Sequence, residues 1–207
     1  MEAYELTDSL SKNEDLEPKD REWWILKPGM SDRGQGIRLF SSLGELTEIF
    51  EAWDPESDDE EDDEYVGDEN ADICTSQLRH FVAQQYIHPP LLIDNTKFHI
   101  RTYVLAVGGL QVYVYRNMLA LFAPLPYAEP GETTDLARHL TNTCLQTGDR
   151  VGTVREFWGL EKELGKPMVE GIWENLCKVV GETFAGAARG QRIHFQVCSV
   201  LLVRDMI

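Results

Sequence analysis

Apolar and polar residues alternate most regularly between Lys97 and Val107. Alternation with a period of two is typical of a β-strand that buries one of its faces. The apolar face would carry Phe98, Ile100, Thr102, Val104 and Ala106, and the opposite face Lys97, His99, Arg101 and Tyr103 before it turns apolar at Leu105. Gly108-Gly109 then predicts a hairpin turn into a second strand at 110–115.

Shorter apolar runs predict further strands at 22–27, 36–40, 81–87, 120–123 and 197–203. Two other stretches repeat apolar residues at helical spacing. The first follows Ser42, which forms with Glu45 the capping-box pattern that begins a helix over 43–53. The second begins at Val169 and keeps its apolar stripe as far as Phe184. Antiparallel strands mixed with helices favour an α+β fold.

Charge is unevenly distributed along the 207 residues. The net charge is −17, but residues 54–72 hold twelve acidic residues and no Lys or Arg, which leaves −5 for the rest of the chain. Such a run predicts a disordered surface insertion, or a docking segment for a basic partner. We therefore expect a polar N-terminal segment over 1–20, either a helix or a linker, and a domain over 21–207 that contains the insertion.

Composition also narrows the class of protein. Four cysteines lie far apart without a CxxC pair, and five histidines show no ligand spacing, so these residues predict no metal site. We find no signal-peptide pattern and no apolar run long enough to span a membrane. We expect a cytoplasmic protein that contacts neither membrane nor, given its acidity, nucleic acid.

The first candidate for chemistry is the loop that follows the apolar run 23–26. Lys27 begins it, and Gly29, Gly34 and Gly36 make it flexible. Glycines let backbone N–H groups approach phosphate oxygens, and a lysine adds a compact positive charge. The loop has neither the Gly-Lys-Ser/Thr ending of a Walker A motif nor the dinucleotide fingerprint. The alternative is a β-turn that merely links two strands.

The second candidate is the polar face of the 97–107 strand. Lys97, Arg101 and His99 would repel one another there, and a bound polyanion would relieve the repulsion. Arg116, which ends the next strand, would join this cluster. The alternatives are a solvent-facing polar side of the sheet and, for Arg116, a surface arginine.

Two short segments are the remaining candidates for ligand binding. Gln84, Gln85, Tyr86 and Ile87 form either an ordinary edge strand or one whose backbone recognises adenine. Residues 139–142, of sequence His-Leu-Thr-Asn, offer hydroxyl and amide groups suited to a ribose or phosphate, or else to capping a turn.

Taken in this order over 22–146, the segments resemble the tubulin-tyrosine-ligase-like family of ATP-grasp ligases, and among them fungal members associated with cytoplasmic processing bodies. The resemblance implies an incomplete ATP-grasp fold, with its central and part of its C-terminal subdomains. It also implies formation of an amide bond through an acyl-phosphate, with ATP and magnesium as cofactors and tubulin or another acidic tail as acceptor.

The resemblance further implies a role for each matching residue. Arg101 would face the γ-phosphate or acyl-phosphate, and Arg116 the acceptor carboxylate. The nucleotide and its pocket would be held by Lys27, Gly34, Gly36, Gln84, Gln85, Tyr86, Ile87, Lys97, Thr141 and Asn142.

Two departures from the family pattern leave the function open. His99 stands where most members have Asp, and residues 197–207 do not match the family's magnesium-binding carboxylates. The chain resembles the central portion of an ATP-grasp protein whose metal ligands lie outside it. We therefore expect either a ligase or a non-catalytic module that binds nucleotide and assembles with processing-body proteins. A weaker third hypothesis is an acidic scaffold acting through 54–72.

Overall fold

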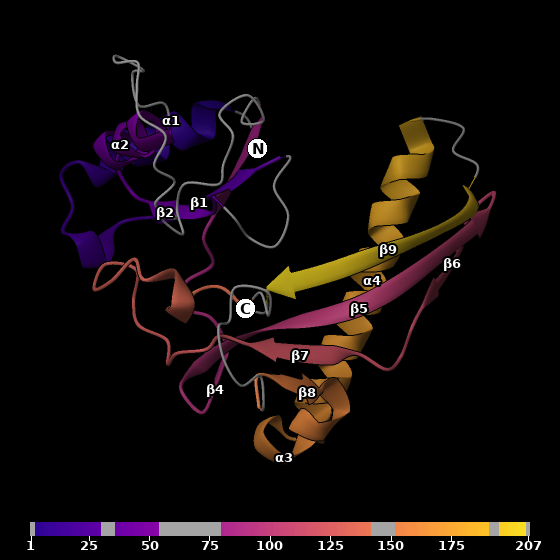
Figure 1. Cartoon of the computed structure of the whole chain (residues 1–207). Coiled ribbons are helices and arrows are strands. Elements are labelled where there is room, and N and C mark those ends of the chain that lie inside the picture. Colours follow the sequence, from indigo (N-terminus) through magenta and orange to yellow (C-terminus); the bar gives the residue numbers. More distant parts are fainter. Residues whose placement is uncertain (1–2, 30–35, 54–79, 142–151, 191–194, 206–207) are drawn as a thin grey trace, which may run out of the picture. The chain divides into compact units, whose positions relative to one another are not determined.

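The computed structural model describes residues 3–29, 36–53, 80–141, 152–190 and 195–205, and the chain divides into two compact units (Figure 1). The first unit comprises 1–89 and 128–147, and the second comprises 90–127 and 148–207. The described part of segment 1–20, which the sequence suggested as separate from the domain, belongs to the first unit. The acidic insertion 54–72 lies outside the described residues.

The first unit is built on an antiparallel sheet of order β2-β1-β3. Its strands are β1 (Trp24–Pro28), β2 (Arg38–Phe40) and β3 (Phe81–Gln85). Helices α1 (Ala3–Asn13) and α2 (Leu43–Trp53) belong to the same unit, with a short helix η1 (Pro18–Asp20) between α1 and β1. A core cluster joins both longer helices to the sheet, with Leu10, Trp24, Leu26, Phe40 and Trp53 as its buried members.

Helix α2 begins where the sequence predicted. The Ser42 hydroxyl accepts a hydrogen bond from the Glu45 amide at 3.1 Å, and the Glu45 carboxylate accepts one from the Ser42 amide at 3.3 Å. This carboxylate also accepts from the Ser41 amide at 2.6 Å. The reciprocal pair confirms the capping box, which satisfies amide groups that have no partner inside the helix.

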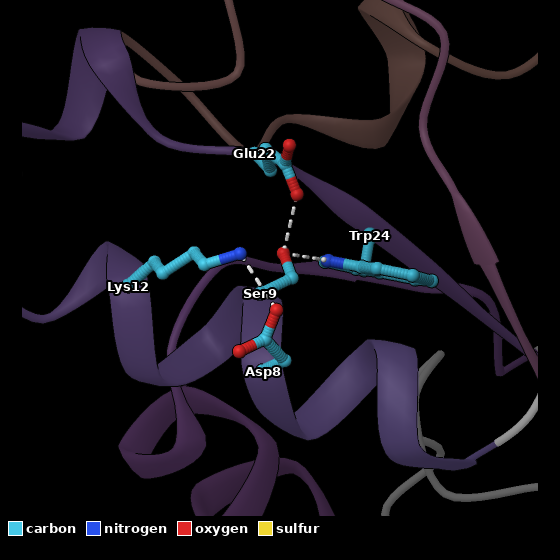
Figure 2. A network of polar contacts seen from close by, with 5 residues as sticks. All are labelled: Asp8, Ser9, Lys12, Glu22 and Trp24. Carbon is cyan, nitrogen blue, oxygen red and sulfur yellow. Dashed lines mark hydrogen bonds and ion pairs between the residues drawn. The ribbon is translucent and has the colours of Figure 1, made fainter.

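Helix α1 is fixed to the sheet by buried polar groups. Asn13, its last residue, is 1% exposed, and its amide donates to the carbonyls of Glu22 at 2.7 Å and Ser41 at 2.8 Å. Its carbonyl oxygen accepts from the Glu22 amide at 2.9 Å. Figure 2 shows a second link, in which Trp24 donates to Ser9 and Ser9 donates to Glu22. The segment left open between helix and linker therefore contains a docked helix.

The other face of this sheet is covered by residues from a later part of the chain. A second cluster consists of Trp23, Ile25, Leu39, Tyr86 and Leu140. Partly buried Leu136, in the short helix η3 (Leu136–Arg138), packs against it. The 128–141 segment thus completes the first unit.

The second unit is organised around β5 (Thr96–Gly108). Strand β5 pairs antiparallel with β4 (Leu92–Ile93), β6 (Gln111–Val114), β7 (Leu119–Phe122) and β9 (Phe195–Asp205), and β7 pairs with β8 (Val154–Glu156). The described residues of this unit form three helices, η5 (Phe157–Leu160), α3 (Glu161–Leu164) and α4 (Lys166–Gly190). None of the helices in the described ranges is both long enough and apolar enough to cross a membrane.

The predicted faces of β5 are confirmed. The five residues assigned to its apolar side, Phe98, Ile100, Thr102, Val104 and Ala106, are all buried. Except for Thr102, they form the core with the α4 stripe, Val169, Ile172, Leu176, Val180 and Phe184. Because α4 covers this face, the opposite face of β5 is left for other contacts.

Candidate nucleotide site

Lys27 and Gln84, predicted as nucleotide contacts, lie together on neighbouring strands of the first unit. Lys27 on β1 donates from Nζ to Oε1 of Gln84 on β3 at 3.0 Å. The register places Ile25 opposite Gln84 and Lys27 opposite Val82, so all four lie on the same face of the sheet. Val82, which sequence reasoning missed, is largely exposed there. The arrangement places a cation beside one exposed apolar side chain, Val82, at the end of the face that carries the buried Ile25.

The glycine loop is described only at its ends. Gly36 is buried and has a φ of 69°, a backbone conformation that glycine adopts without strain. Gly34 and Asn142 lie outside the described residues. Thr141, predicted beside the nucleotide, is buried.

Tyr86, in the predicted adenine segment, is anchored by its side chain. Its hydroxyl lies 2.9 Å from Nδ1 of His139, and Nε2 of this histidine lies 3.0 Å from the Thr133 carbonyl oxygen. A carbonyl can only accept, so Nε2 carries a proton, and in the neutral ring Nδ1 is then the atom that accepts from the Tyr86 hydroxyl. Both side chains are buried. The Tyr86 amide also donates to the Trp23 carbonyl at 2.8 Å, whereas Gln85 is exposed and Ile87 half-buried.

His139 gains a definite structural role from this contact. The sequence placed it beside the candidate Thr141 and Asn142 but assigned it no partner. Tyr86 lies 53 positions away, so no local pattern in the sequence signals the pairing. The structure thus ties the 139–141 segment to the end of β3.

In the second unit, the polar face of β5 carries a buried cation. Lys97 is 3% exposed, while His99 and Arg101 are half-buried. In the described part of the chain, Nε of Arg101 is buried and has no hydrogen-bond partner. A buried N–H of a guanidinium group without an acceptor is costly, and a phosphate or carboxylate oxygen would satisfy it. This donor therefore fits an anionic ligand.

Arg116 is held by an aromatic residue that sequence reasoning missed. Its guanidinium carbon lies 4.8 Å from the ring centre of Trp158, whose indole donates to the Arg116 carbonyl at 2.8 Å. The ring also contacts Trp173 of α4, at 5.9 Å between ring centres. Stacking on tryptophan orients the arginine, yet leaves it exposed. The two residues are 42 positions apart, so the contact has no local sequence signal.

No group of three His, Cys, Asp or Glu within the described ranges could hold a metal ion.

Comparison with known proteins identifies the family. The sequence model of the tubulin-tyrosine ligase family matches residues 1–198. The chain belongs to this family. It is 44% identical to a probable tubulin–tyrosine ligase of Schizosaccharomyces pombe, over 95% of this chain and 50% of the relative. It is also 40% identical to the probable tubulin–tyrosine ligase PBY1 of Saccharomyces cerevisiae, over 92% of this chain and 29% of the relative. The chain thus spans half or less of the length of these tubulin-tyrosine ligase family relatives.

A solved structure establishes the fold. The C-terminal domain of Pby1 from K. lactis matches 99% of this chain and 52% of that chain, with a TM-score of 0.51 and 34% identity. Pby1 is described as an ATP-grasp enzyme that interacts with the mRNA decapping enzyme Dcp2. The predicted α+β, ATP-grasp-like fold and the family resemblance are both confirmed.

Proposed function

We propose that this chain is part of an ATP-dependent ligase of the tubulin-tyrosine-ligase type, which joins an amino acid to a protein carboxylate through an acyl-phosphate. Membership of the family supports the reaction class. The observation that carries the proposal is the buried Nε of Arg101, which has no hydrogen-bond partner among the described residues and shares its strand face with the buried Lys97. Preorganised donors of this kind stabilise charge that develops on a phosphoryl group.

The family resemblance assigns each residue a role in this proposal. ATP, when bound, supplies the phosphoryl group that activates the acceptor carboxylate. Lys27 would hold the α- and β-phosphates, with Gln84 keeping its ammonium in place. Lys97 and Arg101 would hold phosphate oxygens, and the backbone around Tyr86 would hold the adenine. Arg116, oriented on Trp158, would bind the acceptor carboxylate. Gly34, Gly36, Thr141 and Asn142 complete the proposed nucleotide contacts, and magnesium would take its ligands from outside this chain.

The acceptor we propose is an acidic protein tail, tubulin being the candidate suggested by the relatives' names. Arginine suits this task because its planar guanidinium matches the geometry of a carboxylate. We place the reaction in the cytoplasm, where such tails are available.

A second function is favoured by one observation. The similar Pby1 domain is described as interacting with Dcp2. The alternative is therefore a non-catalytic module that binds nucleotide and assembles with processing-body proteins.

Titration of a fluorescent ATP analogue against the intact protein tests nucleotide binding, which both proposed functions require. Lys27→Ala should weaken binding of the analogue at least about tenfold, because it removes a charged hydrogen-bonding group from the phosphates. Lys19→Ala is the matched control, since Lys19 is an exposed lysine of the same unit. Equal affinities for the two variants would remove Lys27 from the nucleotide site.

Turnover separates the two functions. A ligase should release ADP when ATP, magnesium, an amino acid and an acidic tail are all present. Arg101→Ala should then lower kcat by about 10²–10³-fold, the usual cost of removing a charge-stabilising donor. Lys178→Ala, on the exposed side of α4, is the control. ATP binding without ADP release for any acceptor would favour the assembly module.

A further inference from the structure

The face of β5 that carries Arg101 continues beyond it as an exposed group of large side chains. We call this group the tyrosine patch, and its members are Tyr103, Leu105, Tyr113 and Tyr115. Their exposed fractions are 48%, 39%, 56% and 56%. Exposed apolar residues are common singly, but a contiguous group of this size marks an interaction site.

The register shows that the four residues are neighbours. Leu105 on β5 pairs directly with Tyr113 on β6, and the Tyr115 amide donates to the Tyr103 carbonyl at 2.8 Å. All four project away from the face that α4 covers, because the alternate positions Val104, Val112 and Val114 belong to or pack against the core. The patch is therefore a continuous surface of three aromatic rings and a leucine.

Polar neighbours border this surface. Asn117 donates to the Tyr115 hydroxyl at 3.3 Å, and the Tyr113 hydroxyl donates to Gln111 at 3.5 Å. Tyrosine offers a large contact area at low entropic cost because only two side-chain torsions need to be fixed. The patch carries no charge of its own, so it distinguishes ligands by apolar contact.

We propose that the tyrosine patch binds the acceptor polypeptide as an extended segment, whose acyl-phosphate forms at Arg101 and whose apolar or aromatic side chains pack on the patch. This inference rests on the proposed ligase function and adds a substrate class to it. The preferred acceptor is an acidic segment with an aromatic or apolar residue close to the modified position, rather than a purely acidic run.

The order of side chains along β5 indicates that the acceptor polypeptide is the ligand of the tyrosine patch. Lys97 precedes Arg101 on the same face and is assigned to the nucleotide, so Arg101 marks the point where phosphate and acceptor meet. The chain of the acceptor must then leave on the far side of Arg101, where Tyr103 and Leu105 follow. From Arg101 to Leu105 the strand advances about 13 Å, at about 3.3 Å per residue. An extended acceptor would therefore place apolar side chains within about four residues of the reacting carboxylate.

The test compares two short fluorescent peptides of Glu and Ser that are identical except that one carries Phe in place of two Ser. Both are titrated against the intact protein, its Tyr103→Ser/Tyr113→Ser variant, and Leu125→Ser as a control with an exposed apolar residue elsewhere in the unit. The unaltered protein and the control should bind the Phe peptide about tenfold more tightly than the Ser peptide, and the double variant should lose this preference. The thermal midpoint should stay unchanged, because both tyrosines are at the surface.

A fluorescent ATP analogue titrated into the same samples distinguishes failure of the patch inference from failure of the proposed function. If the analogue binds the unaltered protein but both peptides bind equally or not at all, the patch inference is wrong and the proposed function stands. If the analogue does not bind, the proposed function itself fails. Self-association of the protein that disappears in the double variant would identify a second copy as the occupant and also overturn the inference.

Discussion

Replacing Asn13 by alanine should detach α1 from the first unit. The side chain of Asn13 makes three hydrogen bonds, to the Ser41 carbonyl and to both backbone groups of Glu22. Through these bonds it joins the end of α1 to the segments beside β1 and β2. Alanine removes all three and leaves the backbone groups without their partners.

The loss in the free energy of unfolding depends on how deeply each hydrogen bond is buried. The bond to the Ser41 carbonyl is buried, so its loss costs the full penalty of an unsatisfied group, about 1–3 kcal/mol. The two bonds to Glu22 are part-buried, and water recovers some of their value, so each contributes about 0.5–1.5 kcal/mol. The free energy of unfolding should therefore fall by about 2–6 kcal/mol, a large share of the roughly 5–15 kcal/mol typical of a domain.

Hydrogen exchange monitored under increasing urea measures this loss in β1, with β5 of the second unit as an internal reference. Lys12→Ala is the matched control, because Lys12 is adjacent on the same helix and forms an exposed ion pair with Asp8. Such a pair contributes at most about 1 kcal/mol. If Asn13→Ala destabilises β1 no more than Lys12→Ala does, α1 is not held by this residue and the reasoning is wrong.

Three further changes test individual contacts. Tyr86→Phe leaves the buried Nδ1 of His139 without its donor and should cost about 1–2 kcal/mol by urea unfolding, with a loss of protection at the end of β3. Ser42→Ala removes the cap of α2 and should cost about 1 kcal/mol in the same assay, whereas an unchanged midpoint would contradict the capping role. The hydrogen bond from Arg155 lowers the pKa of Glu163 below its ordinary 4.5, so the pair stabilises the fold above that value and the contribution disappears as pH falls through the lower folded pKa. Glu163→Gln should therefore make stability less dependent on pH below about 4.5, and parallel acid profiles for the two proteins would refute this.

Local patterns in the sequence determined the secondary structure that depends on local rules. The alternation at 97–107 predicted both faces of β5, because neighbouring side chains of a strand must point to opposite sides. The Ser42 and Glu45 pair predicted the start of α2, because the capping contacts lie within one helical turn. The apolar stripe from Val169 to Phe184 predicted the covering helix for the same reason. The family motifs were equally local, and the comparisons confirmed the family they indicated.

Only the tertiary structure decided what depends on residues far apart in the chain. It buried Lys97, docked α1 through Asn13, joined Tyr86 to His139, and stacked Arg116 on Trp158. None of these contacts has a periodicity or a spacing, because each is set by how strands and segments from distant positions pack. The tyrosine patch shows the same limit: alternation gives the face of each strand, but the pairing of β5 with β6 and the cover of α4 on the opposite side decide that this face is continuous and exposed.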